Sequence, residues 1–215
     1  LFMENEDLTI SADELRKMLE DKEHVVVLDV RPKDQREEWQ IPGSIYVDAY
    51  QQLNANDPTV LDEVEIPENA KVVTVCAAGR TSQIAANELR KKGIEAYSLE
   101  DGMKGWSLAW NSDYQQFDGF ELWQIRRTGK GCLSYVIASG NEAIIVDASL
   151  PIEVYTQLVN KHHLLVKYVI ETHIHADHLS RSKEVAQYFK APLDLPVPNK
   201  VQFEFNPIKA DTTFS

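Results

Sequence analysis

The sequence predicts an α/β fold in which a doubly wound parallel sheet is followed by a second α/β unit. Three observations lead to this prediction. Near-continuous apolar runs at 25–30 and 71–75 are typical of strands buried on both faces of a parallel sheet. Amphipathic helices alternate with such strands between residues 9 and 112, as in doubly wound sheets. Beyond residue 119 the strands alternate apolar and polar side chains, which indicates a second unit of different construction.

The composition limits the partners and the compartment. The chain has 215 residues and a formal net charge of -12, and an acidic surface disfavours nucleic acid and anionic membranes as partners. Its two cysteines, Cys76 and Cys132, provide no disulfide framework, which favours a reducing compartment. No apolar run approaches the ~20 residues of a membrane helix. Residues 1–7 are acidic and lack a signal-peptide core, so we expect a cytoplasmic location.

The first domain is expected to occupy residues 1–112. Ser11 with Glu14 three positions later forms a capping box that starts a helix. Gly93 ends a later helix whose last turn is basic, as is favourable at a helix C-terminus. In chain order, the expected elements are the helix to residue 20, strands at 25–31 and 71–75, the helix at 81–92 and a strand at 94–99.

A polar segment without periodicity, 113–119, is interpreted as a linker to a second domain at 120–215. Within that domain, the segment from Ser139 to Glu142 is typical of a hairpin turn between two strands. Pro151 is well placed to begin an amphipathic helix. In chain order, the expected elements are strands at 120–125, 132–138 and 143–146, the helix after Pro151 and a strand at 164–170.

Cys76 follows the apolar run 71–75 and precedes a predicted helix, so it is expected at the carboxyl end of a buried strand. The small residues after it let backbone N–H groups turn toward the sulfur, and the helix N-terminus and Arg80 add positive charge. These features stabilise a thiolate, the nucleophilic form of cysteine, so Cys76 and Arg80 are predicted to be catalytic. The predicted substrate-binding residues are Ala77, Ala78, Gly79, Thr81 and Ser82.

A buried structural cysteine is the alternative role for Cys76. We assign that role to Cys132, because no basic residue or helix start follows it closely.

Three histidines and an aspartate fall within six consecutive positions after the strand at 164–170. Residues two apart in extended backbone point to the same side, so the first two imidazoles converge. The turn that follows adds a carboxylate and a third imidazole, and borderline divalent metals are bound by this mixture of donors. A polar turn with chance histidines is the alternative. The predicted metal ligands are His173, His175, Asp177 and His178.

Residues 9–112 resemble a rhodanese domain, the sulfurtransferase fold. The resemblance is carried by Leu28-Asp29-Val30-Arg31, Ile41-Pro42-Gly43-Ser44-Ile45, the loop at Cys76 and Asp101-Gly102-Met103-Lys104-Gly105-Trp106. It implies a persulfide on Cys76, cradled by backbone N–H groups. The chain departs from the family pattern at Trp39-Gln40, where Gly-His is usual, and at Thr81, where arginine is common. A phosphatase of this fold would place cysteine and arginine six positions apart, whereas Cys76 and Arg80 are four apart.

The motif Thr172-His173-Ile174-His175-Ala176-Asp177-His178 is similar to the metal motif of the metallo-β-lactamase superfamily. The order of elements before it resembles the first half of that family's αββα sandwich, so a partial sandwich is expected. In detail the segment looks most like the persulfide dioxygenase branch, which oxidises glutathione persulfide with Fe²⁺ and O₂. The resemblance implies Fe²⁺ as the cofactor, His173 as one ligand and further ligands beyond residue 215, so the metal would be incompletely ligated in this chain.

Three functions stay open at this point. The first is a rhodanese module joined to a persulfide dioxygenase module, with thiosulfate or glutathione persulfide as a small-molecule sulfur donor. The second is a thioester hydrolase of the glyoxalase II type, with Zn²⁺ held by the same segment. The third is a non-catalytic persulfide carrier. No nucleic-acid or membrane partner is expected, and a homo-oligomer stays open.

Overall fold

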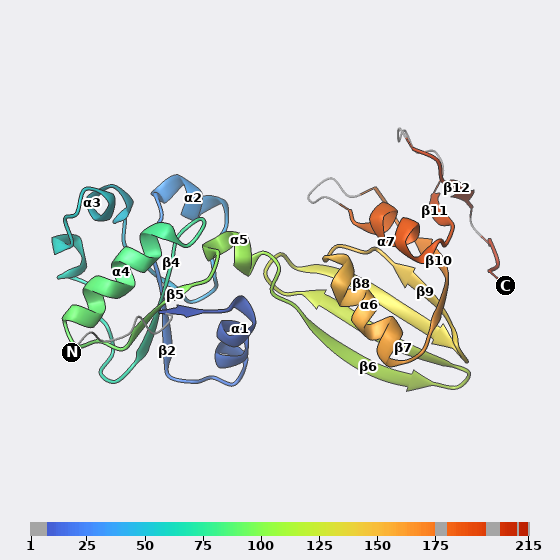
Figure 1. Ribbon diagram of the computed structural model, residues 1–215, viewed down its shortest axis with the longest axis horizontal. Helices are drawn as coiled ribbons and strands as arrows, with labels where there is room; N and C mark the ends of the chain where they lie inside the picture. The colour runs from blue at the N-terminus through green and yellow to red at the C-terminus, as the bar shows by residue number, and fades with distance from the viewer. Residues whose placement is uncertain (1–7, 175–179, 197–202, 210, 215) are drawn as a thin grey trace. The chain divides into compact units, whose positions relative to one another are not determined.

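The computed structural model of the protein describes residues 8–174, 180–196, 203–209 and 211–214. Contacts divide the chain into two compact units, Leu1–Ala109 and Trp110–Ser215, both drawn in Figure 1. Each unit combines a sheet with helices, which confirms the predicted α/β fold class. Among the described residues, no helix is long and apolar enough to cross a membrane.

The first unit is built on a five-stranded parallel sheet with strand order β1-β5-β4-β2-β3. Its strands are β1 (Thr9–Ile10), β2 (Val25–Asp29), β3 (Ile45–Tyr46), β4 (Lys71–Val75) and β5 (Ala96–Leu99). Its helices are α1 (Ala12–Glu20), α2 (Lys33–Glu38), α3 (Tyr50–Asn54), α4 (Arg80–Lys91) and α5 (Gly102–Trp106), with a 3-10 turn η1 at Thr59–Leu61. The strands and helices expected between residues 9 and 112 are confirmed.

The central strand β4 is buried on both faces. Successive side chains of a strand point to opposite faces. Val72 packs in one core cluster with Leu89 of α4, and Val73 packs in another with Leu15 of α1. All four side chains are fully buried. Because both faces of the sheet are covered by helices, the strand is apolar at nearly every position, and the doubly wound arrangement is confirmed.

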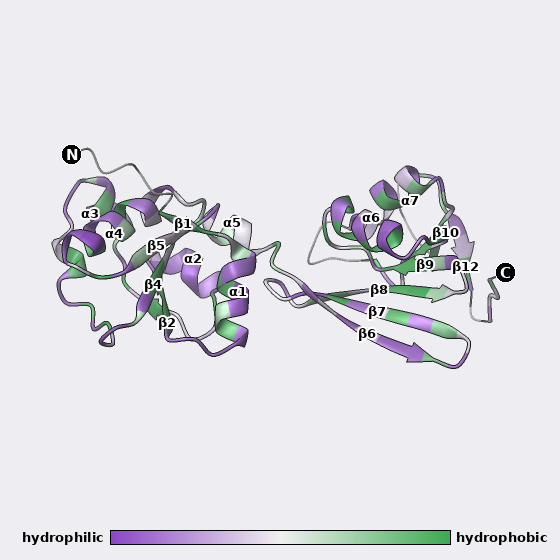
Figure 2. Cartoon of the chain, turned by 60° about the horizontal axis from the view of Figure 1, so that its bottom comes forward, coloured by the Kyte–Doolittle hydropathy of each residue, from purple (hydrophilic) through white to green (hydrophobic). Residues whose placement is uncertain are grey.

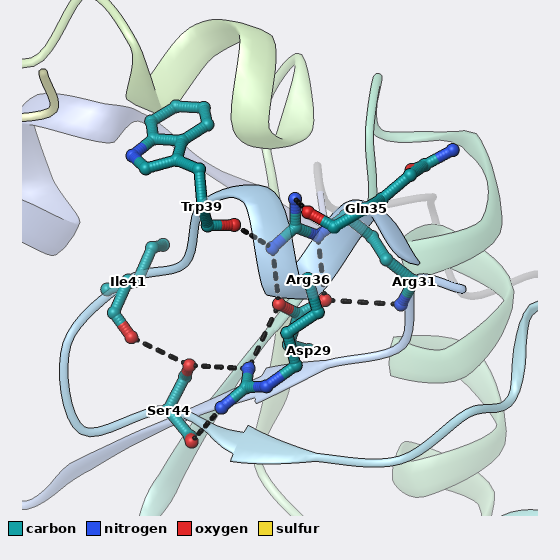
Figure 3. Close-up of polar contacts among 7 residues, drawn as sticks. All are labelled: Asp29, Arg31, Gln35, Arg36, Trp39, Ile41 and Ser44. Carbon is teal, nitrogen blue, oxygen red and sulfur yellow. Dashed lines mark hydrogen bonds and ion pairs between the residues drawn. The ribbon is translucent and has the colours of Figure 1, made fainter. Parts of the chain in front are cut away.

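A buried charge cluster organises the end of β2 (Figure 3). The Asp29 carboxylate is fully buried and accepts hydrogen bonds from Arg31 Nε (2.9 Å) and Nη2 (2.7 Å) and from Arg36 Nη1 (3.1 Å). The same two guanidinium groups donate to the backbone oxygens of Trp39 (2.7 Å) and Ser44 (2.9 Å). One carboxylate therefore ties β2 to helix α2 and to the turn that leads into β3.

The second unit contains a seven-stranded sheet among its described residues, with order β12-β11-β10-β9-β8-β7-β6. Its strands are β6 (Asn111–Phe117), β7 (Phe120–Arg127), β8 (Cys132–Ser139), β9 (Glu142–Val146), β10 (Leu165–Ile170), β11 (Leu193–Pro196) and β12 (Asn206–Ile208). Pairing is antiparallel from β6 to β9 and parallel from β9 to β12. Helices α6 (Ile152–Lys161) and α7 (Ser182–Phe189) lie on one side of the sheet (Figure 2).

The segment 113–119, expected to be a linker, belongs instead to a hairpin. Strand β6 pairs with β7 along its whole length, and the rings of Tyr114 and Trp123 lie 5.2 Å apart across the pair. β6 is the edge strand, and most of its side chains are exposed. An edge strand exposed on both faces needs no apolar alternation, which is why its sequence has the composition of a linker.

The face of this sheet opposite α6 and α7 carries a row of apolar side chains. Leu122, Ile137, Ile144 and Tyr168 are successive cross-strand partners on β7, β8, β9 and β10. Each is half-buried, and Phe214 packs edge-on against Tyr168 with ring centroids 4.9 Å apart. A sheet that is apolar on both faces is typical of the inner layer of a sandwich, in agreement with the expected partial αββα arrangement.

Candidate functional site

Cys76 lies directly after β4, the middle strand of the first sheet, and three residues before the N-terminal cap of α4. Ligand sites in doubly wound sheets form at the carboxyl ends of the strands, where loops connect to helices. The cysteine is 3% exposed, so its sulfur lies inside the loop rather than on the surface. Cys76 therefore lies where the sequence predicts it, at the carboxyl end of a buried strand and before a helix.

Two donors surround the sulfur. Gly79 N–H donates to Cys76 Sγ at 3.2 Å, and Ser82 Oγ lies 3.3 Å from the same atom. Gly79 has φ 90°, a left-handed conformation that brings its N–H toward the sulfur at the start of a twelve-residue helix. A backbone N–H, a hydroxyl and the positive end of a helix all stabilise negative charge on sulfur.

Ser98 on β5 extends this hydrogen-bond network. Its Oγ lies 2.8 Å from Ser82 Oγ, and both side chains are fully buried. Each hydroxyl has one proton to donate. When Ser98 donates to Ser82, the single Ser82 proton can go to Cys76 Sγ at 3.3 Å or to Gly79 O at 3.1 Å. Sequence reasoning missed Ser98, because β4–β5 pairing, not a local motif, brings it beside the loop.

The backbone of the cysteine loop rests on α5. A Cβ added at Gly102 would lie 2.2 Å from Cys76 O, so only glycine fits at this position. Met103 N donates to Cys76 O (2.8 Å), and Lys104 N donates to Ala77 O (3.1 Å). The backbone of the Asp101–Trp106 motif therefore holds the cysteine loop in place, a role that the sequence did not indicate.

Of the four remaining predicted residues, three lie on the solvent side and the fourth, Thr81, is buried in α4. Ala77, Ala78 and Arg80 are exposed, so they line the solvent side of the loop. Thr81 is buried, and its hydroxyl accepts a hydrogen bond from Asn54 of α3 at 3.1 Å. This contact joins α3 to α4, whereas Ser82 of the same helix contacts the sulfur.

The predicted metal segment begins where β10 ends. Thr172 N and Oγ1 donate to the Asp147 carboxylate at 2.8 and 2.5 Å, and Thr172 Oγ1 lies 2.8 Å from Nδ1 of the exposed His173. The other three predicted ligands, His175, Asp177 and His178, lie outside the described residues. Among the residues that are described, no group of three or more His, Cys, Asp or Glu side chains is arranged to hold a metal.

The contact to Thr172 bears on how His173 could bind a metal. A hydrogen bond at Nδ1 orients the ring and leaves ligation to Nε2, as is usual for histidines that bind metals. An imidazole followed by two more and a carboxylate fits a divalent cation of the iron or zinc type.

Two family models match the chain. "Rhodanese-like domain" matches residues 11–109, and "Metallo-beta-lactamase superfamily" matches residues 127–206. A thiosulfate sulfurtransferase GlpE from Pseudoalteromonas translucida is 32% identical over 97 residues, which are 45% of this chain and 86% of that protein. The putative sulfur carrier protein YrkF of Bacillus subtilis is 27% identical over 100 residues, 46% of this chain and half the length of that protein.

Among solved structures, ETHE1 from Myxococcus xanthus is similar at 18% identity and a TM-score of 0.35, covering 47% of this chain and 42% of that one. A metallo-beta-lactamase from Staphylococcus aureus is similar at 20% identity and a TM-score of 0.41, covering 45% of this chain and 30% of that one.

Proposed function

Through residues 11–109 the chain belongs to the rhodanese-like family, and on that premise we propose that it is a sulfurtransferase with Cys76 as the sulfur-carrying nucleophile. The observation that carries this proposal is the pair of donors on Cys76 Sγ, Gly79 N–H at 3.2 Å and Ser82 Oγ at 3.3 Å. They stabilise a thiolate both when it attacks and when it leaves, and sulfur transfer requires both.

The reaction we propose has two steps. With thiosulfate as donor, the Cys76 thiolate attacks the outer sulfur, the S–S bond of thiosulfate breaks, and sulfite leaves with the bonding electron pair. Cys76 then carries a persulfide. An acceptor thiolate attacks its terminal sulfur, the new S–S bond breaks, and the Cys76 thiolate is regenerated while the acceptor becomes the persulfide.

Sulfite release in a single turnover tests this proposal. Wild-type protein mixed with thiosulfate should release close to one sulfite per chain. Cys76→Ser should release none, because an alcohol at this position is not ionised. Cys132→Ser is the matched control, since Cys132 lies at the start of β8 in the other unit, and it should behave as wild type. Release from Cys76→Ser at the wild-type level would refute the assignment.

We further propose that His173, His175, Asp177 and His178 take part in a divalent metal site in the second unit. The match of residues 127–206 to the metallo-beta-lactamase superfamily and the contact from Thr172 to His173 Nδ1 support it. Ferrous iron would supply redox chemistry with O₂, whereas zinc would supply Lewis acidity for hydrolysis. The protein's own contribution is to orient the imidazoles.

We favour persulfide oxidation over thioester hydrolysis, because a persulfide is the product of sulfur transfer to a thiol. Glutathione persulfide would then be made or accepted at Cys76 and consumed at the metal site. Oxygen uptake with glutathione persulfide by the full-length protein, measured after loading with Fe²⁺, tests the assignment. Uptake that His173→Ala abolishes would support it.

Other outcomes identify the two alternatives. Hydrolysis of a glutathione thioester by Zn²⁺-loaded protein, without oxygen uptake, would favour the glyoxalase II type. Sulfur loading at Cys76 with neither second activity would favour a persulfide carrier.

A further inference from the structure

A groove in the second unit lies between the edge of its sheet and α6, on the side of the sheet that carries the helices (Figure 2). It has a volume of about 450 Å³, which is typical of sites for small molecules. All the residues that line it are described and belong to the second unit. Neither cysteine and none of the predicted metal ligands is among them, so the groove is separate from both proposed sites.

Aromatic rings form much of the groove surface. Tyr114 of β6 and Trp123 of β7 are cross-strand partners with ring centroids 5.2 Å apart, and the His162 ring lies 4.7 Å from Trp123. Trp110, just before β6, is half-buried against the same core. Trp123 is 5% exposed and Tyr114 is 50% exposed, so the aromatic surface extends from the core to solvent. A half-exposed ring beside a groove offers a face on which a flat ligand can stack.

Helix α6 presents apolar and polar side chains to the same groove. Val154 and Leu158 line it, and so do the exposed Gln157 and Lys161. Residues four apart lie on one face of a helix, so the amide of Gln157 and the ammonium group of Lys161 are neighbours. In the part of the chain that the structure describes, neither group has a polar partner. Both are therefore available to a ligand.

The charge at the groove is opposite in sign to the charge of the chain. Lys161 is cationic, and of the described residues that line the groove none is acidic. The chain as a whole has a formal net charge of -12. The Glu121 carboxylate, which accepts the Tyr114 hydroxyl proton at 2.6 Å, does not line the groove. An unpaired ammonium group at an aromatic groove is complementary to a negatively charged ligand.

We propose that this groove binds a small, planar aromatic anion. The ring of the ligand stacks against Tyr114 and Trp110, and its anionic group pairs with Lys161. Gln157 supplies a hydrogen bond beside that group. The proposal goes beyond sulfur transfer and does not depend on it, because Cys76 lies in the other unit.

Indoleacetate and tryptamine test the proposal, because they share a flat ring and differ in the sign of their charge. Each is titrated into the full isotope-labelled chain, and the N–H signals of the protein are followed by NMR. Indoleacetate should shift the signals of Trp123 and Lys161 and bind about 2- to 10-fold more tightly than tryptamine, since one ligand attracts Lys161 and the other repels it. Cyclohexylacetate has the carboxylate without the flat aromatic ring, so it should bind more weakly than indoleacetate.

Lys161→Met separates charge from stacking. It should weaken indoleacetate about 2- to 5-fold and remove the preference over tryptamine. Lys167→Met is the matched control, because Lys167 pairs with Glu142 at 3.0 Å and does not line the groove, and both affinities should stay unchanged. Tyr114→Ala should weaken both ligands about 2- to 10-fold. Should Tyr114→Ala not fold, Gln157→Trp fills the groove from an exposed helix position and should abolish binding of both.

Three results would overturn the proposal. The first is that no probe shifts the groove signals at millimolar concentration. The second is that indoleacetate and tryptamine bind equally well and Lys161→Met changes neither. The third is that the groove signals shift with protein concentration alone, which would show that a second copy of the chain covers the groove. Sulfite release should be unchanged in Lys161→Met, so failure here is distinguishable from failure of the sulfurtransferase assignment.

Discussion

Replacing Ser82 by alanine removes a hydroxyl whose oxygen lies 3.3 Å from Cys76 Sγ. Hydrogen bonds to charged groups contribute about 1.5–3 kcal/mol. A change of 1.36 kcal/mol in a barrier alters a rate about tenfold. If the bond is made to the thiolate, persulfide formation from thiosulfate should slow by about 10- to 100-fold. Gly79 N–H remains as a donor, so the reaction should not be abolished.

Ser98→Ala should have a smaller effect. Ser98 acts on the sulfur indirectly, through Ser82, at 2.8 Å between the two hydroxyl oxygens. A hydrogen bond between neutral groups contributes about 0.5–1.5 kcal/mol, so a decrease of about 2- to 10-fold is expected. The rate of persulfide formation should therefore be highest in wild type, lower in Ser98→Ala and lowest in Ser82→Ala. This order is expected of a hydrogen-bond network that ends on the sulfur.

Thr74→Val is the matched control for both serines. Thr74 is fully buried on β4, two residues before Cys76, and its hydroxyl donates to backbone oxygens rather than to the sulfur. Single-turnover sulfite release and alkylation by iodoacetamide, measured over a pH series, give the rates. Thr74→Val should lose stability but keep the rate. A Ser82→Ala rate equal to wild type, or an equal decrease in Thr74→Val, would refute the reasoning.

Three further predictions concern the surroundings of the two sites. Gly102→Ala should displace the cysteine loop, because its Cβ would meet Cys76 O at 2.2 Å, and sulfite release should fall at least as far as in Ser82→Ala. Asp29→Asn should lower the free energy of unfolding in urea by about 3–5 kcal/mol, because the buried Arg31 and the half-buried Arg36 lose their counter-charge. Asp194 is buried and its pKa is raised by desolvation, so the folded state holds the proton more tightly than the unfolded chain. The contribution of Asp194 to stability should therefore fall as pH rises above the ordinary value of 3.8, and Asp194→Asn should raise the melting temperature at pH 7 but not below pH 3.8. Melting curves of Asp194→Asn that match wild type at both pH values would contradict this last prediction.

The cysteine loop could be predicted because its signals are local. An apolar run ends at Cys76, small residues follow, and a helix begins at Arg80. These features specify a strand, a turn and a helix N-terminus in order. Ser98 could not be predicted, because it reaches Ser82 through the pairing of β4 with β5, and nothing in its neighbourhood in sequence indicates a contact with sulfur.

Strand β6 shows a different limit. This strand is stabilised by backbone pairing with β7 and by contacts such as that of Tyr114 with Trp123, not by burial of most of its own side chains. A pattern of apolar and polar residues reports burial, so it does not report an exposed edge strand. In residues 173–178 the sequence pattern predicts the side chains that would bind a metal. Of these four predicted ligands, His173 is the one that lies within the described residues.

Mass spectrometry of the peptide that contains Cys76 tests the central claim most directly. The protein is incubated with thiosulfate, protected from reduction and digested, and the peptides that carry the two cysteines are compared. We predict a mass gain of one sulfur atom on the Cys76 peptide, reversed by an excess of thiol, and no gain on the Cys132 peptide. An unmodified Cys76 peptide, or an equal gain on both, would contradict the account.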